Sequence, residues 1–361
     1  MKSKNSFRSI AILLPFKEKY SPKDFGSISL YVKDINDLSI YKKKIKVFAH
    51  KTFSFFPGTQ VVSLKKNIWH FLAGKNIGQT KEFIKKVRTS PPDIIEIHNR
   101  PKSAIMISKL LTKSKLFLFY HNDPLSFSSN ASISDRIELI NKCEGICFVS
   151  SYLKNRFLEN IPKGKVDKSK LHVIYNGVKP IKKMHPSKKR KNIVFVGELS
   201  NKKGFHYFHE AVNAIIAEFK EWRVDIFGKP LNQKVLDKNI NQIRFHGYKS
   251  NKFILNFLSK STISVIPSVW QEPFGRTLIE SINAGTATIT STNGGLKEIA
   301  RYFKVLKLSE INKKTIYLSI KKLIMSENDK KYYSNNSIEH SPFTLNKISE
   351  KLDSIRTRAL R

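Results

Sequence analysis

A loop and the helix expected after it, in the last third of the chain, carry residue types suited to binding phosphate and sugar hydroxyls. Gly275 directly precedes the helix expected over Arg276–Asn283, so a ligand can approach the backbone closely there. Open amides in a first helical turn and the helix dipole favour an anion, and Arg276 adds a permanent charge. Glu272 and Glu280, eight positions apart, could accept hydrogen bonds from hydroxyls on either side of that anion. Such a pair would suit a sugar nucleotide, but a glycine before a helix and two glutamates are each common, so the pattern alone does not separate a site from an ordinary helix start.

The elements that must position these residues alternate between short apolar strands and longer amphipathic helices. Expected strands run over 10–16, 45–50, 61–64, 93–98, 116–121, 145–149 and 171–175, and then over 192–197, 223–227, 243–246, 263–267, 287–291 and 304–308. Expected helices include 28–38, 81–87, 103–111, 135–141, 151–159, 205–219 and 251–260. This alternation predicts an α/β fold of parallel sheets covered by helices on both faces.

A basic stretch over 179–192, KPIKKMHPSKKRKN, has a linker composition and separates the two series of strands. It predicts two Rossmann-like domains, over 1–178 and over 179–342. Residues 343–361 carry apolar side chains at helical spacing, which predicts a last helix; a frayed surface helix is the alternative to a packed one. Ligands bind beyond the carboxyl ends of such strands, which points to a cleft between two facing domains.

Charge and composition narrow the classes further. Lys+Arg is 66 against 28 Asp+Glu, a formal charge of +38. The charge suits an anionic membrane, anionic substrates or no task at all if it reflects codon bias. No interleaving of aromatic and basic residues supports nucleic-acid binding. No apolar run approaches the ~20 residues of a membrane span. Cys143 and Cys147, the only cysteines, exclude a disulfide framework and indicate a reducing compartment.

The segment EPFGRTLIE, over 272–280, resembles the E-x7-E signature of glycosyltransferase family 4, the glycosyl transferases group 1, which are retaining enzymes of the GT-B fold. Further matching segments occur in the family's order: Phe25-Gly26-Ser27, YHNDP over 120–124, the stretch 171–178, NIVFVGELSNKKG over 192–204, Phe227-Gly228 with Pro230, Pro267-Ser268, and Asn293-Gly294-Gly295 with Glu298. The resemblance therefore covers most of the chain and implies two facing Rossmann-like domains, with 1–178 on the acceptor side and 179–342 binding the nucleotide sugar. It also implies that the helix over 343–361 crosses back to the first domain.

The resemblance also implies roles for individual residues. Glu272 and His121 would contact the donor sugar, Glu280 the ribose, and Lys203 the departing diphosphate. Gly26 would let an N-terminal loop approach the diphosphate. The residues expected to hold the sugar and diphosphate, partly through backbone amides, are Phe274, Gly275, Arg276, Thr277 and Leu278. His98, at a strand end, is either part of the site or a structural histidine.

The implied activity is retaining, metal-independent transfer of a sugar from a nucleoside diphosphate, UDP favoured over GDP, with no cofactor. A glycan or glycolipid acceptor in cell-surface polysaccharide or lipopolysaccharide synthesis is expected. The enzyme would be cytoplasmic, and we expect peripheral attachment to the inner membrane face near the N-terminal domain, with Lys42–Lys44 as a candidate contact. One position departs from the family pattern: Glu198 stands where an arginine is usual, which leaves a non-catalytic scaffold as an alternative. A basic nucleic-acid-binding protein is the less favoured alternative.

Overall fold

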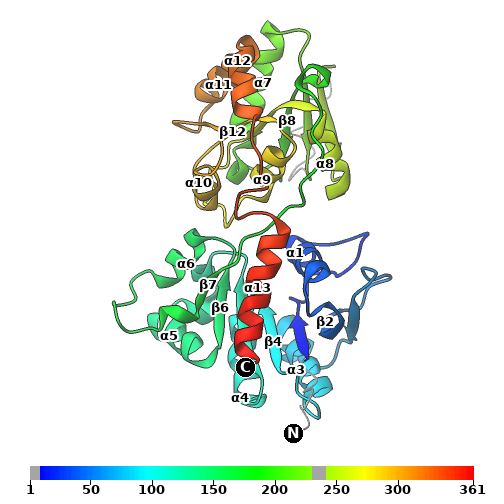
Figure 1. Ribbon diagram of the computed structural model, residues 1–361, viewed down its shortest axis with the longest axis vertical. Helices are drawn as coiled ribbons and strands as arrows, with labels where there is room; N and C mark the ends of the chain where they lie inside the picture. Colours follow the sequence, from blue (N-terminus) through cyan, green and yellow to red (C-terminus); the bar gives the residue numbers. More distant parts are fainter. Residues whose placement is uncertain (1–8, 230–240) are drawn as a thin grey trace. The chain divides into compact units, whose positions relative to one another are not determined.

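The computed structural model describes residues 9–229 and 241–361, in two compact units (Figure 1). Residues up to Gly177 and the segment Leu345–Arg361 form the first unit, and Val178–Thr344 forms the second. The chain thus passes between the units twice, within one or two residues of the expected boundaries. Pro230, part of one family-like turn, lies outside the described residues.

The first unit is built on a seven-stranded sheet in the order β3-β2-β1-β4-β5-β6-β7, and every neighbouring pair in it is parallel. Its strands are β1 (Ile10–Leu13), β2 (Ile45–His50), β3 (Gln60–Leu64), β4 (Ile94–His98), β5 (Lys115–Tyr120), β6 (Gly145–Phe148) and β7 (Leu171–Val173). Its helices are α1 (Ser27–Leu38), α2 (Trp69–Leu72), α3 (Lys75–Val87), α4 (Pro101–Leu110), α5 (Ile133–Lys142), α6 (Ser151–Leu158) and α13 (Leu345–Ala359). This agrees with the expected parallel sheet covered by helices.

The second unit has a six-stranded parallel sheet in the order β10-β9-β8-β11-β12-β13. Its strands are β8 (Arg190–Val196), β9 (Arg223–Phe227), β10 (Ile243–Gly247), β11 (Ser261–Ile266), β12 (Ala287–Thr290) and β13 (Leu306–Lys307). Its helices are α7 (Phe205–Glu218), α8 (Asn251–Ser259), α9 (Arg276–Asn283), α10 (Gly295–Ile299), α11 (Lys313–Met325) and α12 (Glu327–Ser334). Two Rossmann-like units of this kind constitute the GT-B fold.

Local sequence explains where several elements begin and end. Serine side chains cap α5, α6 and α8 by accepting an amide of the first turn. Strand β1 stops at Leu13, three residues earlier than expected, because Pro15 has no amide to donate to a neighbouring strand. The left-handed Gly285 (φ 70°) follows the end of α9, as expected of a C-terminal stop.

The composition of residues 179–192 predicts a linker, but only part of this stretch lies outside regular structure. Strand β8 already begins at Arg190. Lys183 donates to the carbonyl of Asn336, and Lys189 donates to that of Gly285. Burial lowers the pKa of Lys189 to about 8. These contacts make the stretch part of the second unit's surface.

Helix α13 packs in the first unit, against α1 (Figure 1). Its residues Ile348, Leu352 and Ile355 join the core formed around β1 and β2. Asp353 accepts hydrogen bonds from the Ser39 hydroxyl (2.7 Å) and the Ile40 amide (2.8 Å). A segment encoded after the whole second unit therefore completes the first one.

Both cysteines are buried, free thiols within the first unit. Burial raises the pKa of Cys143 to about 12, so neither reactivity nor metal binding is favoured there. Among the described residues, no helix combines the length and apolar character that a membrane span requires.

Candidate functional site

Three loops of the second unit interlock beyond the carboxyl ends of β8, β11 and β12. The amides of Val269 and Trp270 both donate to the Lys202 carbonyl, at 3.0 and 2.9 Å. The Gly295 amide donates to the Glu272 carbonyl at 2.7 Å. Because β8 and β11 are neighbours from which the chain winds in opposite directions, the loops meet at the position where doubly wound sheets bind ligands.

Two glycines make this close approach possible. A Cβ on Gly204, which has φ of 67°, would overlap the Pro267 carbonyl oxygen. A Cβ on Gly294, with φ of 60°, would lie 2.4 Å from the Glu272 carbonyl oxygen. Larger residues at these positions would separate the loops that carry the candidate residues.

Glu272 is oriented by two donors on a single oxygen. Its Oε1 accepts from the Lys203 ammonium at 2.5 Å and from the Ser268 hydroxyl at 2.7 Å. Within the described part of the chain, no partner is recorded for Oε2, and that atom is not among the fully buried unpaired ones. One oxygen is thus fixed, and the other can accept from a ligand hydroxyl.

Glu280 has the same arrangement one and a half turns into α9. Its Oε1 accepts from Asn251 Nδ2 at 2.7 Å and from Arg276 Nε at 2.8 Å. The described contacts again leave Oε2 without a donor. The two glutamates flank the start of α9, as their spacing predicts, but Arg276 is drawn toward Glu280.

The amino terminus of α9 differs from the expectation in one respect. Gly275 (φ 104°) precedes the helix as expected, and a Cβ there would overlap Leu296. The Leu278 amide, however, donates to the Gly275 carbonyl at 3.0 Å, because this first turn closes on the third residue. The expectation of an open amide at Leu278 is therefore wrong, and Thr277 remains as a candidate donor. Phe274 is buried, with its ring centroid 5.8 Å from that of Phe343.

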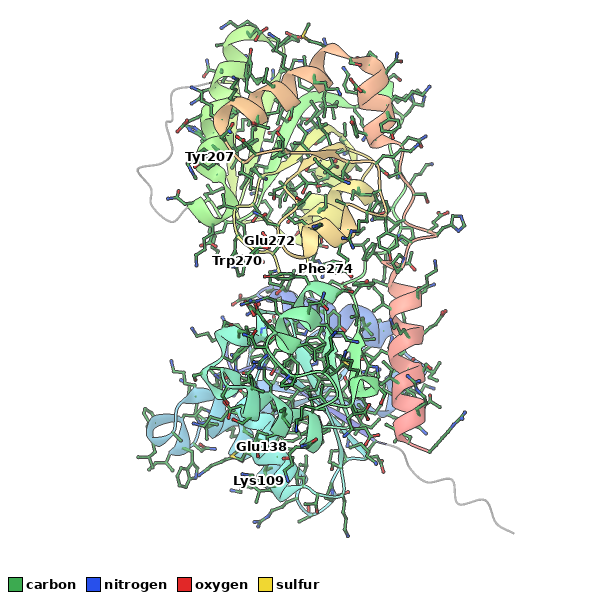
Figure 2. All side chains as sticks on the ribbon, turned by 90° about the vertical axis from the view of Figure 1, so that its left-hand side faces the viewer. Lys109, Glu138, Tyr207, Trp270, Glu272 and Phe274 are labelled. Carbon is green, nitrogen blue, oxygen red and sulfur yellow. The ribbon has the colours of Figure 1, made fainter. Side chains whose placement is uncertain are left out.

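Lys203 is positioned by a second neighbour, Trp270, whose ring centroid lies 5.1 Å from the ammonium. Figure 2 shows Trp270, Glu272 and Phe274 close together at one end of the second unit. A lysine has three N–H donors, so Lys203 can bond Glu272 and still donate to a phosphate oxygen. Glu198 is exposed, and no ion pair with Lys202 or Lys203 is recorded for it in the described residues.

In the first unit, His121 forms a buried pair with His98. His98 Nδ1 lies 2.9 Å from His121 Nε2, and the Asn99 side chain fixes the His121 backbone amide at 2.7 Å. The Tyr31 ring packs edge-on against both imidazoles. Burial lowers the pKa of His121 from 6.5 to about 3, and burial followed by the proximity of His121 holds the pKa of His98 well below its usual value. Both imidazoles are therefore neutral at pH 7, and one proton bridges them.

Asp123 is close to His121 in sequence, but among the described residues its hydrogen bonds go to other partners. Its carboxylate accepts from the Leu125 amide at 3.0 Å and pairs with Arg156 at 3.2 Å. The residue forms a turn before a short 3-10 helix and ties α6 to it.

Gly26, expected to approach a diphosphate, instead lies against a carboxylate of its own chain. A Cβ at this position would overlap the Glu18 side chain. Glu18 accepts from the Ser29 amide and hydroxyl, both at 3.2 Å, at the amino terminus of α1. Burial raises the pKa of Glu18. The structure thus explains this glycine by the closeness of Glu18, and an anion could bind there only if Glu18 moved or were protonated.

Comparisons with known proteins bear on the family and the fold. A family model described as glycosyl transferases group 1 matches residues 179–340, and one described as glycosyltransferase family 4 matches residues 44–181. The two matches overlap over residues 179–181 and together span 44–340, most of the chain. The chain belongs to the glycosyl transferases group 1 family.

Individual relatives of this group 1 glycosyltransferase are distant. Spore coat protein SA of Bacillus subtilis is 24% identical over 309 residues, covering 76% of this chain and 78% of that protein. An uncharacterized 42.6 kDa protein in the cps region of Klebsiella pneumoniae is 27% identical over 261 residues, with 66% and 67% covered. Among solved structures, Anabaena Alr3699/HepE in complex with UDP and glucose has a TM-score of 0.75 at 17% identity, covering 97% of this chain and 99% of that one. WaaG, a glycosyltransferase involved in lipopolysaccharide biosynthesis, has a TM-score of 0.70 at 12% identity, covering 96% and 99%. These structural likenesses show the fold.

Three residues that contact the candidate side chains had no role assigned from the sequence. Asn251 reaches Glu280 from α8, Ser268 binds Glu272, and Trp270 flanks Lys203. Asn251 has no sequence signal, because it comes from a separate helix. Ser268 was noted only as part of the matching segment Pro267-Ser268, and Trp270 could have been found as an aromatic residue just before the motif.

The histidine pair predicts acid sensitivity of this glycosyltransferase. In the unfolded chain each histidine has its ordinary pKa of 6.5 and binds a proton below that pH. In the folded chain both histidines stay neutral, so the free energy of unfolding falls as the pH drops below about 6.5. At pH 5 the loss is about 2 kcal/mol for each buried histidine. Urea unfolding at pH 7 and pH 5 measures it. His121→Asn should reduce the difference, while His185→Asn, at an exposed position, should not. An identical pH dependence in the two variants would contradict the prediction.

Proposed function

We propose that the protein transfers a sugar from a nucleoside-diphosphate sugar to an acceptor hydroxyl, retaining the anomeric configuration and using no metal. The main support is the pair of glutamates at the start of α9, each fixed through Oε1 with Oε2 left to accept. Their spacing suits sugar hydroxyls on one side of a diphosphate and ribose hydroxyls on the other.

Departure of the diphosphate is the step that needs stabilisation, because negative charge develops on the leaving oxygen. Lys203 supplies an ammonium, and the amino terminus of α9 supplies the helix dipole and the Thr277 amide. Glu272 and Glu280 bind hydroxyls in this proposal and do not act as a nucleophile and acid. The acceptor attacks on the face from which the diphosphate leaves, and a leaving phosphate oxygen takes the acceptor proton. His121 would contact the donor sugar as a neutral imidazole.

UDP is the favoured nucleotide, since Anabaena Alr3699/HepE was solved with UDP and with UDP-glucose. A cell-surface glycan or glycolipid is the favoured acceptor, because WaaG takes part in lipopolysaccharide biosynthesis and the Klebsiella protein belongs to the cps region. Attachment to an anionic membrane surface at the cytoplasmic face is part of the proposal, supported by the charge of +38. Nucleic acid is not proposed as a partner.

A panel of nucleotide sugars tests the enzyme directly. Thermal shift identifies the donor that stabilises the protein, and product mass after incubation with candidate acceptors identifies the transfer. Glu272→Gln should weaken donor binding by about 10–100-fold, the effect of losing hydrogen bonds to a charged group. Glu210→Gln, exposed on α7, is the matched control. No stabilisation and no hydrolysis with any donor would contradict the proposal and favour the scaffold alternative raised by Glu198.

A further inference from the structure

One turn of helix in the first unit presents large apolar side chains to solvent. Ile68, Trp69, Phe71 and Leu72, in and just before α2, are exposed by 67%, 41%, 85% and 69%. Phe53, after the neighbouring strand β2, is fully exposed. Single exposed apolar residues are ordinary, but a contiguous group of this size marks an interaction surface.

This turn is held with its apolar side outward by polar contacts on its inner side. His70 is buried between the exposed residues, and its Nδ1 accepts from the Asn67 amide at 2.9 Å. Asn67 Nδ2 donates to the Gly78 carbonyl at 3.1 Å, which ties the turn to α3. A Cβ on Gly78 would overlap His70, so a glycine is needed for this packing. The contacts of His70 and Asn67 therefore fix the orientation of α2 and keep its apolar side chains exposed to solvent.

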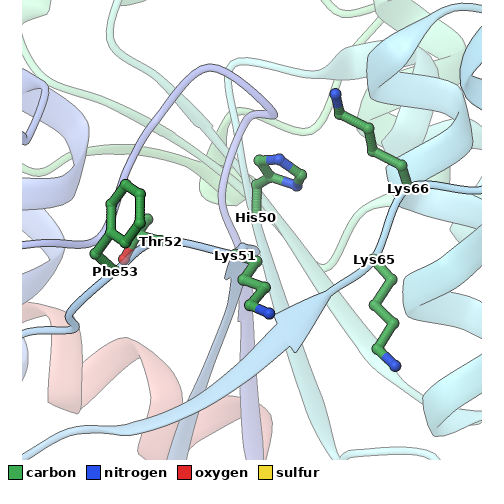
Figure 3. A pocket seen from close by; sticks show the side chains of 6 residues that line it. All are labelled: His50, Lys51, Thr52, Phe53, Lys65 and Lys66. Carbon is green, nitrogen blue, oxygen red and sulfur yellow. The ribbon is translucent and has the colours of Figure 1, made fainter.

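A hollow rich in lysine lies between Phe53 and the segment that leads into α2. This hollow of about 360 Å³ between the ends of β2 and β3 is lined by His50, Lys51, Thr52, Phe53, Lys65 and Lys66, a lining without a carboxylate (Figure 3). Figure 3 shows the amino groups of Lys65 and Lys66 on opposite sides of the chain, so the two can contact separate anions. Burial and then the charge of Lys66 lower the pKa of His50, as expected in a positive environment.

The sheet places this surface on the edge that carries His121. Strands β2, β3 and β5 are parallel members of one sheet, so the segments after their carboxyl ends emerge at the same edge. Four strand spacings of about 4.8 Å separate β3 from β5, which gives about 19 Å across the sheet. Lys42–Lys44 precede β2 and therefore lie at the opposite, amino edge.

We propose that residues 51–53 and 65–72 form a docking surface for an anionic phospholipid bilayer. Phe53 and the exposed residues of 68–72 insert at the level of the lipid headgroups, and Lys51, Lys65 and Lys66 bind lipid phosphates. Aromatic and aliphatic side chains flanked by lysines, with no carboxylate in the hollow, match the chemistry of that interface. The docking surface would bring a lipid-borne acceptor to the sheet edge that bears His121, and in this respect the inference rests on the proposed function.

Vesicle flotation tests the apolar part. The full-length protein should float with phosphatidylcholine vesicles that contain phosphatidylglycerol and much less with phosphatidylcholine alone. Phe71→Ser with Leu72→Ser should weaken binding at least about ten-fold. The matched control, Ile40→Ser with Leu110→Ser, removes two exposed apolar residues that follow α1 and end α4, at the amino edge, and should bind normally.

The charges are tested with two triple variants. Replacing Lys51, Lys65 and Lys66 by glutamine should weaken binding by about five-fold per lysine, roughly a hundred-fold in total at low salt. The same change at Lys42–Lys44 should have little effect. Equal recovery on both vesicle types, or loss only in the Lys42–Lys44 variant, would overturn the proposal. A third outcome would also overturn the proposal: the unchanged protein does not bind vesicles, and Phe71→Ser with Leu72→Ser sediments as a smaller particle than it does. The surface would then be a contact between copies of this chain.

Donor binding measured without lipid separates this inference from the proposed function. All these variants should keep the thermal shift produced by the identified nucleotide sugar. Vesicle binding without any donor binding would leave the docking surface standing and refute the enzyme, and donor binding without vesicle binding would do the reverse.

Discussion

Replacing Lys203 by alanine is expected to lower kcat by about 10²–10³-fold, the usual effect of removing one group that stabilises developing charge. The ammonium lies 2.5 Å from Glu272 and beside Trp270, so it is already held at the start of α9 before a donor arrives. Its loss removes the positive side chain that the proposal places on the leaving diphosphate. Steady-state kinetics with the donor found in the screen measures the effect.

Lys202→Ala is the control for this prediction, because the Lys202 side chain is exposed and only its backbone carbonyl joins the loops. It should retain near-normal kcat. Lys203→Ala combined with Glu272→Gln should cost less than the sum of the single effects, since the two residues share a contact. A normal kcat in Lys203→Ala would remove Lys203 from the mechanism.

Replacing Arg356 by alanine is expected to destabilise the first unit by about 3–5 kcal/mol. Arg356 is 1% exposed, and its guanidinium binds both oxygens of Glu96, at 2.7 and 2.9 Å. It also donates to Asp353, Ser39 and Asn36, each at 3.1 Å. Burial alone would lower the pKa of Arg356, but Glu96 and then Asp353 raise it above its ordinary value. Without the arginine, two buried carboxylates lose their counter-charge.

Urea unfolding measures this loss, with Arg358→Ala as the control on the exposed side of the same helix. Arg356→Lys should recover part of the stability, because a lysine keeps the charge but cannot bond both oxygens of Glu96 in one plane. Joint replacement of Arg356 and Glu96 by leucine should cost less than Arg356→Ala, since no uncompensated Glu96 remains. If Arg356→Ala and Arg358→Ala unfold alike, the network contributes nothing.

Periodicity in the sequence was sufficient to predict the two parallel sheets. Strands such as β2 (IKVFAH) and β9 (RVDIF) are short segments in which most residues are apolar, and their bounds match the expected ranges. Motif spacing likewise placed Glu272, Gly275 and Glu280 around one helix start. Each of these features depends on residues that are close together in the sequence, so the sequence alone is enough to predict them.

Features that depend on distant partners were not predictable in this way. The contact of Glu96 with Arg356 joins residues far apart in the chain, and His98 meets His121 only because β4 and β5 are neighbours in the sheet. Gly26 was assigned to a ligand, whereas Glu18 occupies the adjacent space. Ile68 and Phe71 are residue types normally found inside, and their exposure depends on the placement of His70.

The return of α13 to the first unit has a consequence for how the protein is made. The second unit is one continuous stretch of chain, so its hydrophobic core can form while the last residues are still being translated. The first unit, although its strands are translated earlier, lacks Ile348, Leu352 and Arg356 until synthesis has passed the entire second unit. During that interval Glu96 has no counter-charge and the apolar surface that α13 covers is open to water. The usual order, in which the amino-terminal domain matures first, should therefore be reversed in this nascent chain, and the exposed half is the one expected to need chaperones.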